Sequence, residues 1–418
     1  MVSGSPGHKP RARLSRAQSA KQTREALIDA ALRVFMRFGY GKTSVARITQ
    51  EAGVSQGNFY SYFSSHTELL SMLLPIEGER IQAALGEAPK SGSFFRKERQ
   101  RFQLILRYVR ERPYILRLLV ESEAGDPEGF RQYMLQVEQR YLDACAIAQA
   151  AGEVRHLSED EVRVIAEMVA GCRAQIALHL ETLSHEGTKL RARHERWSVD
   201  ALEKFLANGL GAEAAPVVQF SQVKGRRASP LSLKESIFEA AAVEIGEVGF
   251  AATTVQAILA RANIALGTFY AYFGSREQFF VGLLRYSRRL IAARVREAVA
   301  GSTDVVDIEA RGLYAFFEAL VDKPWLASLP AEAAVWAPDA YRLHFGVISR
   351  SYRWRLRAIA KQGQLEAYSA DELVVLGAIF TSARHYLASR FLRRGDAEAP
   401  KWVVKIYAEI VAVGLSPK

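Results

Sequence analysis

The chain contains one sequence pattern twice, and this duplication constrains the fold more than any other feature. Residues 25–70 and 235–280 align without a gap, with 14 identities in 46 positions at a spacing of 210 residues. The repeat continues at a spacing of 211, with "ERPYILRLLVESEAGDPEGFRQY" at 111–133 opposite "DKPWLASLPAEAAVWAPDAYRLH" at 322–344. The 418 residues are therefore predicted to form two complete units joined by a linker.

Both units are predicted to be all-α. Between residues 27 and 38 the apolar residues recur at steps of three and four, as the buried face of a helix requires. Ser158 and Glu161, and likewise Ser369 and Glu372, have the spacing of a capping box at a helix start. Alternating strand patterns are absent, and long helical patterns occur at 101–120, 128–150, 159–184 and 198–208, with counterparts in the second half.

The repeated segment at 43–63 is predicted to be two short helices joined by a tight turn. Thr43 or Ser44 can cap the first helix, Gly53 suits a left-handed turn, and Ser55 can cap the second helix. Small polar groups surround a tyrosine on the outward side of that second helix, at Gln56, Gly57, Asn58, Tyr60 and Ser61. This pattern is typical of a helix-turn-helix motif, whose second helix enters the major groove of DNA.

The whole string "VFMRFGYGKTSVARITQEAGVSQGNFYSYFSSHTELL" resembles the DNA-binding domain of the TetR (tetracycline repressor) family of bacterial regulators. The second copy, "VEIGEVGFAATTVQAILARANIALGTFYAYFGSREQFF", fits the pattern more loosely. The resemblance implies a double-stranded DNA operator as partner, and His66 occupies the position of a phosphate-binding lysine of the family. The DNA contacts expected from it are Thr43, Ser44, Ser55, Gln56, Gly57, Asn58, Tyr60, Ser61 and His66, then Thr253, Thr254, Leu266, Gly267, Thr268, Tyr270 and Arg276.

The second copy departs from the first in ways that predict different DNA binding. Ala265 replaces the capping Ser55, which weakens a helix start by about 1 kcal/mol, and Leu266 replaces the polar Gln56. Residues 24–70 carry five basic and four acidic side chains, whereas residues 234–280 carry three and five. We expect the second head to bind DNA more weakly, or to read another half-site through contact with thymine methyl groups.

The resemblance also implies a domain order. We expect a basic flexible arm at 1–22, a first helix-turn-helix domain at 23–70 and a first helical ligand-binding domain at 71–210. A linker at 211–232, a second helix-turn-helix domain at 233–280 and a second ligand-binding domain at 281–418 would follow. The arm and the cluster "VKGRRASP" carry much of the formal charge of +11, which favours a polyanionic partner.

Two alternatives for assembly follow from the family's two-fold dimers. Small residues on the last long helices of each unit suit close helix packing, at Ala166, Ala170, Gly171, Ala174, Gly377, Ala378, Thr381 and Ser382. The favoured assembly is an intrachain pseudo-dimer with two unlike heads, and a homodimer of tandem chains with four heads is the alternative. A regulator that acts through protein partners, with one or both heads no longer binding DNA, is the second functional hypothesis.

The effector expected from the resemblance is a small hydrophobic molecule. "ESEAGDPEGFR" resembles a stretch of the fatty-acid-responsive repressors of the family, which suggests an acyl-type ligand. The second unit has Trp336 in place of the glycine there, so we expect only one working pocket. Aromatic candidates for the pocket linings are Tyr114, Phe130 and Tyr133, then Trp325, Trp336, Tyr341 and Trp354.

Other classes of protein are disfavoured by the sequence. No HExxH, GxSxG or phosphate-binding loop appears, so we expect neither an enzyme nor a bound cofactor or metal. No apolar run is long enough to span a membrane. Cys145 and Cys172 are the only cysteines and are expected to be small core residues in a cytoplasmic, nucleoid-associated protein.

Overall fold

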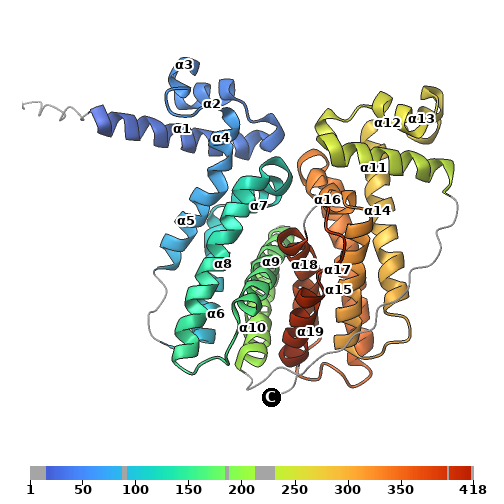
Figure 1. The fold of residues 1–418 in the computed structure, drawn as a ribbon. Coiled ribbons are helices and arrows are strands. Elements are labelled where there is room, and N and C mark those ends of the chain that lie inside the picture. The colour runs from blue at the N-terminus through green and yellow to red at the C-terminus, as the bar shows by residue number, and fades with distance from the viewer. Residues whose placement is uncertain (1–15, 87–91, 184–187, 212–230, 393–394, 416–418) are drawn as a thin grey trace, which may run out of the picture. The chain divides into compact units, whose positions relative to one another are not determined.

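The computed structural model describes residues 16–86, 92–183, 188–211, 231–392 and 395–415. Every regular element in these ranges is helical, which confirms the all-α prediction. The chain divides into two compact units, Met1–Leu73 and Leu74–Lys418 (Figure 1). None of the described helices combines the length and the apolar character that crossing a membrane requires.

The first unit holds the first copy of the repeated motif. It consists of α1 (Arg16–Phe38), a 3₁₀ turn η1 (Tyr40–Lys42), α2 (Val45–Ala52), α3 (Gln56–Phe59) and α4 (His66–Ser71). Helix α1 begins at Arg16, so residues 16–22, which we assigned to the arm, are helical, while residues 1–15 lie outside the described residues. The core of this unit forms from the apolar positions read from the sequence, with Leu27, Phe35, Ile48, Phe59 and Phe63 all buried.

The second unit begins with the rest of the first repeat. Its helices are α5 (Leu73–Leu85), α6 (Phe94–Glu111), α7 (Tyr114–Gly125), α8 (Pro127–Ala150), α9 (Glu159–Leu183) and α10 (Thr188–Gly211). The single helical pattern expected at 101–120 is wrong, because α6 ends at Glu111 and α7 starts after Pro113. Proline disfavours helical geometry in the residue before it, and Arg112 accordingly has φ −136° and ψ 68°.

The second repeat follows in the same unit with matching elements. Helix α11 (Leu233–Ala252) starts after its cap, Ser232. Residues 212–230 of the expected linker lie outside the described residues. Gly249, with φ 77°, interrupts α11 where Gly39, with φ 78°, precedes η1. The remaining helices are α12 (Val255–Ala262), α13 (Leu266–Tyr272), α14 (Arg276–Ala298), α15 (Val305–Asp322), α16 (Trp325–Trp336), α17 (Pro338–Ala360), α18 (Glu372–Phe391) and α19 (Lys401–Leu415).

Both predicted capping boxes form in the second unit. Ser158 Oγ accepts a hydrogen bond from the Glu161 N–H at 3.3 Å, and Glu161 accepts one from the Ser158 N–H at 2.9 Å. The corresponding distances for Ser369 and Glu372 are 3.3 and 2.7 Å. These reciprocal bonds satisfy N–H groups that the first turn of a helix leaves free, and they fix the starts of α9 and α18.

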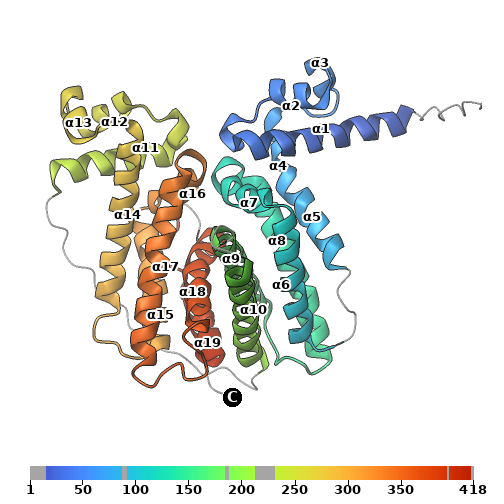
Figure 2. The same cartoon turned by 180° about the vertical axis from the view of Figure 1, so that it is seen from behind.

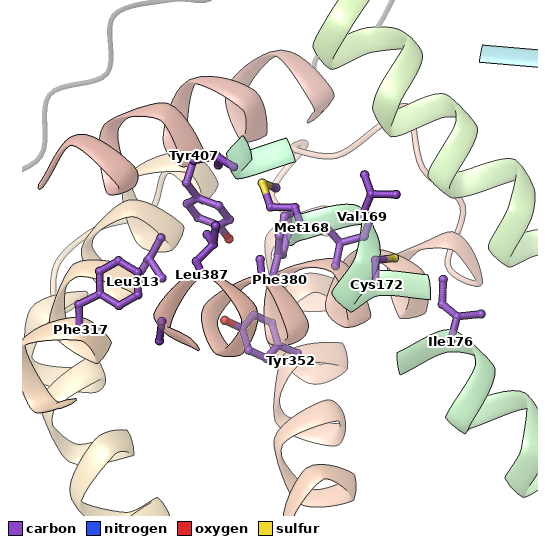
Figure 3. Close-up of a cluster of buried hydrophobic side chains, with 14 of the residues drawn as sticks. Met168, Val169, Cys172, Ile176, Leu313, Phe317, Tyr352, Phe380, Leu387 and Tyr407 are labelled. Atoms are coloured by element: carbon purple, nitrogen blue, oxygen red, sulfur yellow. The ribbon is translucent and has the colours of Figure 1, made fainter. Parts of the chain in front are cut away.

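Four helices, two from each repeat, pack side by side in the middle of the second unit (Figures 1 and 2). Helix α9 packs along α18, and α10 packs against α18 and α19. The core is continuous across this contact, as Figure 3 shows for buried residues of both repeats, among them Met168, Val169, Cys172, Phe380, Leu387 and Tyr407. Cys145 and Cys172 are both free and buried.

Close contact between α9 and α18 depends on a glycine. A Cβ atom at Gly171 would lie 2.8 Å from the ring of Tyr386 and 3.1 Å from the Cβ atom of Ser382. Gly377, also expected at a helix–helix contact, instead lies under Tyr352 of its own repeat. The small residues therefore divide between the contact of the two repeats and the core of one repeat.

Ion pairs join the two repeats around this apolar contact. Lys204 Nζ lies 3.0 Å from Glu372 Oε1, and Arg390 lies 2.9 Å from Glu138 Oε2. His385 Nε2 lies 2.8 Å from Glu123 Oε2. These pairs connect α18 of the second repeat to α10, α8 and α7 of the first repeat.

Candidate nucleic-acid interface

The first head has the helix-turn-helix geometry predicted from its caps and glycine. Ser44 caps α2 by accepting a hydrogen bond from the Arg47 N–H, and Gly53 follows α2 in the left-handed region with φ 68° and ψ 31°. Ser55 caps α3 and accepts a hydrogen bond from the Asn58 N–H at 3.1 Å. These three residues fix the angle at which α3 leaves α2.

One face of α3 is buried and the other is open. Phe59 is fully buried and Phe63 nearly so, and the two rings lie 5.5 Å apart. Tyr60 is 58% exposed, although it follows Phe59 directly. The remaining predicted contacts on this segment are also exposed, at Gln56, Gly57, Asn58 and Ser61.

Gly57 is a glycine that the fold itself does not require. A Cβ atom built there would have only Ser55 Oγ within 4 Å, at 3.9 Å, which is an ordinary contact. Its N–H group lies in the first turn of α3, where no intrahelical acceptor exists. The bare backbone at this point is therefore open to a surface outside the unit.

Thr43 and Thr253 are placed differently from the expectation that they contact DNA. Their side chains are 5% and 3% exposed, and each donates a hydrogen bond to a glycine carbonyl, from Thr43 to Gly39 at 2.9 Å and from Thr253 to Gly249 at 2.8 Å. They hold the turn after the first helix of each head. Their neighbours Ser44 and Thr254 remain accessible and act as caps.

His66 and Arg276 have an internal role that the sequence did not indicate. His66 Nε2 lies 2.7 Å from the carbonyl oxygen of Thr43, and Arg276 Nη2 donates to the carbonyl of Thr253 at 3.0 Å. The two pairs are equivalent at the repeat spacing. Different side chains thus make the same link in the two heads. Each joins the start of a helix, α4 or α14, to the threonine that ends the turn after the first helix of the head.

Two exposed cations of the first head were missed at the sequence level. Lys42 and Arg47 flank the start of α2, and the Arg47 guanidinium lies 4.6 Å from the centre of the Phe38 ring. The second head has Ala252 and Ala257 at these positions. The alignment of the two copies indicates these cations, because only the first copy has basic residues at the two positions.

Three other arginines of the heads form ion pairs within the head. Arg33 and Arg37 pair with Glu51 at 2.8 and 2.9 Å, and Arg261 pairs with Glu244 at 2.9 Å and with Glu247. The two arginines hydrogen-bonded to Glu51 hold the pKa of its carboxyl below the usual value. Lys42 and Arg47, by contrast, are exposed and form no ion pair with any of the described residues.

The second head keeps the geometry of the motif but changes its surface. Thr254 caps α12, and Asn263 adopts the left-handed conformation with φ 54°. Ala265 makes no cap bond, yet α13 has 7 residues where α3 has 4. Its outward face is more apolar, with Leu266, Tyr270 and Tyr272 at 51%, 57% and 46% exposed. Gly267 is exposed and Thr268 is half-buried.

Comparison with known proteins agrees with this geometry. Residues 27–73 and 237–283 each match the family model of bacterial regulatory proteins of the tetR family. The chain is a tandem TetR-family transcriptional regulator. The two matches cover the two helix-turn-helix heads.

Individual relatives match parts of this regulator. An uncharacterized HTH-type transcriptional regulator of Haemophilus influenzae is 28% identical over 145 residues, which are 34% of this chain and 76% of that protein. TtgW of Pseudomonas putida is 40% identical over 58 residues, 14% of this chain and 43% of that protein. The solved fatty acid degradation regulator FadR from Bacillus halodurans is 16% identical with a TM-score of 0.38, covering 45% of this chain and 95% of that one.

Proposed function

We propose that this regulator is a repressor that a small hydrophobic effector releases from DNA, and that its two heads act as an intrachain pseudo-dimer on one asymmetric operator. The observation that carries the proposal is the packing of α9 and α10 against α18 and α19. Each repeat contributes its last two long helices to this contact, as two separate chains do in a two-fold dimer. The repressor sign follows from resemblance to the family, and the site of action is the cytoplasmic chromosome.

The unlike surfaces of the heads support an asymmetric operator. The first head offers Gln56 and Asn58 for adenine edges and Lys42 and Arg47 for phosphates. The second head offers Leu266, which suits a thymine methyl group, and lacks those cations. Two half-sites of one sequence would not match both heads.

The test is the native mass of the protein, alone and with DNA from just upstream of its own gene. One chain on each duplex is the expected result. Two chains on each duplex would mean a homodimer of tandem chains with four heads, and would refute the intrachain pseudo-dimer. A gel shift at two salt concentrations belongs with this test, because binding through phosphates weakens steeply as salt rises.

A second candidate is a regulator that acts through protein partners. The exposed Leu266, Tyr270 and Tyr272 favour it, because an exposed apolar face suits a protein better than DNA. If no upstream DNA gives a salt-sensitive shift, this second candidate replaces the repressor proposal.

A further inference from the structure

The second repeat contains a cavity of about 1780 Å³. Its walls come from α11, α14, α15, α16, α17 and α18, with Glu123 and Ala124 of α7 and Pro127 of α8 at the edge. Trp325 and Trp354, two of the aromatic residues expected to line a pocket, lie in these walls. In the first repeat, the void beside Phe102 and Arg173 holds only about 10 Å³. Trp336 is not among the lining residues, so the replacement of glycine by this tryptophan does not close the cavity.

One substitution between the repeats places a long basic side chain at the cavity. A Cβ atom at Gly78 of α5 would lie 2.6 Å from Gln136 Oε1 and 2.8 Å from the Tyr133 ring of α8, so α5 and α8 are in direct contact there. The residue 210 positions later is Arg288, which lines the cavity. A side chain of that length cannot fit into the packing around Gly78, whereas in the second repeat it lies at the cavity although α14 packs against α17.

A buried ionic cluster also differs between the repeats. In the first, Glu98 accepts hydrogen bonds from Tyr141 at 2.8 Å and Arg173 at 2.9 Å, and pairs with Arg101 and Arg140 at 2.6 and 3.1 Å. The equivalent Glu309, Tyr352 and Arg384 meet in the second repeat, with Arg384 at 3.1 Å from Glu309 Oε2. The two extra arginines have no counterpart there, because their positions, 211 residues later, are Gly312 and Ser351.

Of these two positions, Gly312 lies against the Arg384 guanidinium and Ser351 lies at the cavity. Tyr352, Ser351 and Arg384 all line the cavity. Arg384 is only 8% exposed, and its Nε atom has no hydrogen-bond partner within the part of the chain that the structure describes. A buried N–H group without a partner costs free energy; the equivalent Nε atom of Arg173 also has none, but only Arg384 lies at a cavity large enough for a ligand to supply an acceptor.

Further cations in the walls lack partners. Arg288, Arg350 and Arg355 line the cavity and form no ion pair with any of the described residues. Burial and the nearby positive charges of Arg285 and Arg350 lower the pKa of Arg288. The equivalent positions in the first repeat are uncharged, being Gly78, Gln139 and Ala144.

The imidazole of His344 adds another open polar group. It is 6% exposed, and its Nδ1 atom has no hydrogen-bond partner in the described ranges. The acidic groups near these cations are largely engaged, since Glu123 pairs with His385 at 2.8 Å and Glu235 pairs with Arg289 at 2.8 Å. Burial raises the pKa of Glu332, which also lines the cavity. The cavity therefore has an excess of positive charge without a counter-ion from the protein.

The rest of the lining is apolar and includes part of the second head. Ile291, Phe316, Leu320 and Ile348 are lining residues from the ligand-domain helices. From α11, the first helix of the second head, the walls include Lys234, Phe238 and Gly246. A molecule bound there would touch this helix directly, so its binding energy would act on the position of the head.

We propose that the second repeat alone binds the effector and that the effector is an amphipathic anion, an apolar chain or ring that ends in a carboxylate or phosphate group. This inference rests on the proposed function, because it names the chemistry of the molecule that releases DNA. The apolar lining takes the chain, and Arg288, Arg355 and Arg384 with His344 take the anionic end. The first repeat keeps the fold of a ligand-binding domain and serves as a packed support.

The first experiment titrates the full chain with probes that share an apolar chain and differ in charge. Decanoate and decanoyl coenzyme A are the two anionic probes, decanol is the neutral one and decyltrimethylammonium is the cation. Tryptophan fluorescence reports binding, since Trp325 and Trp354 line the cavity. We expect one site per chain and at least tenfold tighter binding of an anion than of decanol or the cation. A preference between the two anionic probes distinguishes a free acid from an acyl thioester.

Variants then locate the site. Arg288→Gln and Arg355→Gln should each weaken anion binding about tenfold, as loss of a charge-assisted hydrogen bond implies. Arg357→Gln, an exposed position two residues further along the same helix, is the matched control and should bind as the unmodified chain does. Thermal melting of each variant shows that it is folded. Two sites per chain, equal binding of decanol, or unchanged binding by both cavity variants would overturn the inference.

The gel shift separates this inference from the proposed function. If the anion binds as expected but leaves the DNA complex intact, the site stands and the ligand-released repressor fails. If decanoate releases DNA equally from the unmodified chain and from both cavity variants, the repressor stands and the assignment of the site fails.

Discussion

Gly57→Ala is the perturbation that separates the DNA surface from the fold most cleanly. The nearest atom to the new methyl group is Ser55 Oγ at 3.9 Å, so no atom of the protein has to move. Replacing glycine by alanine in a compatible helical position stabilises a protein by about 0.4–1 kcal/mol, because the unfolded chain loses freedom. We therefore expect the variant to unfold at a slightly higher denaturant concentration than the unmodified chain.

The same methyl group should weaken DNA binding. It stands beside an N–H group in the first turn of α3, at the point where a bare backbone allows close approach. Loss of one hydrogen bond to a charged phosphate costs about 1.5–3 kcal/mol, or roughly a tenfold to 150-fold weaker complex. A gel shift with upstream DNA at one fixed salt concentration measures this loss.

Gly267→Ala is the matched control in the second head. A Cβ atom there would have nothing within 4 Å, so its effect on stability should be similar. A smaller loss of affinity than for Gly57→Ala would mean that the first head carries most of the DNA binding. If Gly57→Ala is folded and binds DNA as tightly as the unmodified chain, the assignment of α3 as the DNA-facing helix is refuted.

Three further changes test individual contacts. Ala265→Ser should stabilise the second head by about 1 kcal/mol, because the backbone there already has cap geometry with φ −71° and ψ 148°; unchanged chemical unfolding would contradict this. Glu98→Gln should destabilise the first repeat by about 3–5 kcal/mol, because it leaves buried Arg173 without its counter-charge, and thermal melting checks it. Burial, only partly offset by Arg390 and reinforced by Glu138, raises the pKa of Glu167 to about 8. An unfolded glutamate titrates near ~4.3, so between these values the folded state holds a proton that the unfolded state has lost. The stability should therefore fall as pH rises through this window, by up to about 1.4 kcal/mol per pH unit. Glu167→Gln should remove that slope in urea unfolding at pH 5, 6, 7 and 8, and an unchanged slope would refute the assignment.

Local features of the heads could be predicted from the sequence because short-range physics fixes them. Ser55 caps α3 and Gly53 takes a left-handed turn in the structure, and both follow from residue type and spacing alone. The second copy shows the same rules, with Asn263 in the turn and no cap bond at Ala265. The repeat itself is visible because both copies keep the same buried apolar positions.

Two local features were not predicted from the sequence: the helix boundary at Pro113 and the exposed cations of the first head. The apolar pattern at 101–120 continues through Pro113, although the residue before a proline leaves the helical region, so one helix was expected where two exist. Lys42 and Arg47 were not predicted as DNA contacts, because the predicted contacts are the positions that the resemblance to the family implies.

The sequence by itself determined the all-α fold, the duplication and the two helix-turn-helix heads, since each depends on residues close together along the chain. Only the tertiary structure decided which side chains remain available. Thr43 and Thr253 were predicted to be exposed DNA contacts, but packing of the turn after the first helix buries both side chains. Likewise, the sequence shows Gly78 and Arg288 at equivalent positions, but only the structure shows that Gly78 lies against Tyr133 and that Arg288 lines a cavity. Such contacts join residues tens of positions apart, and their consequence depends on the shape of both surfaces.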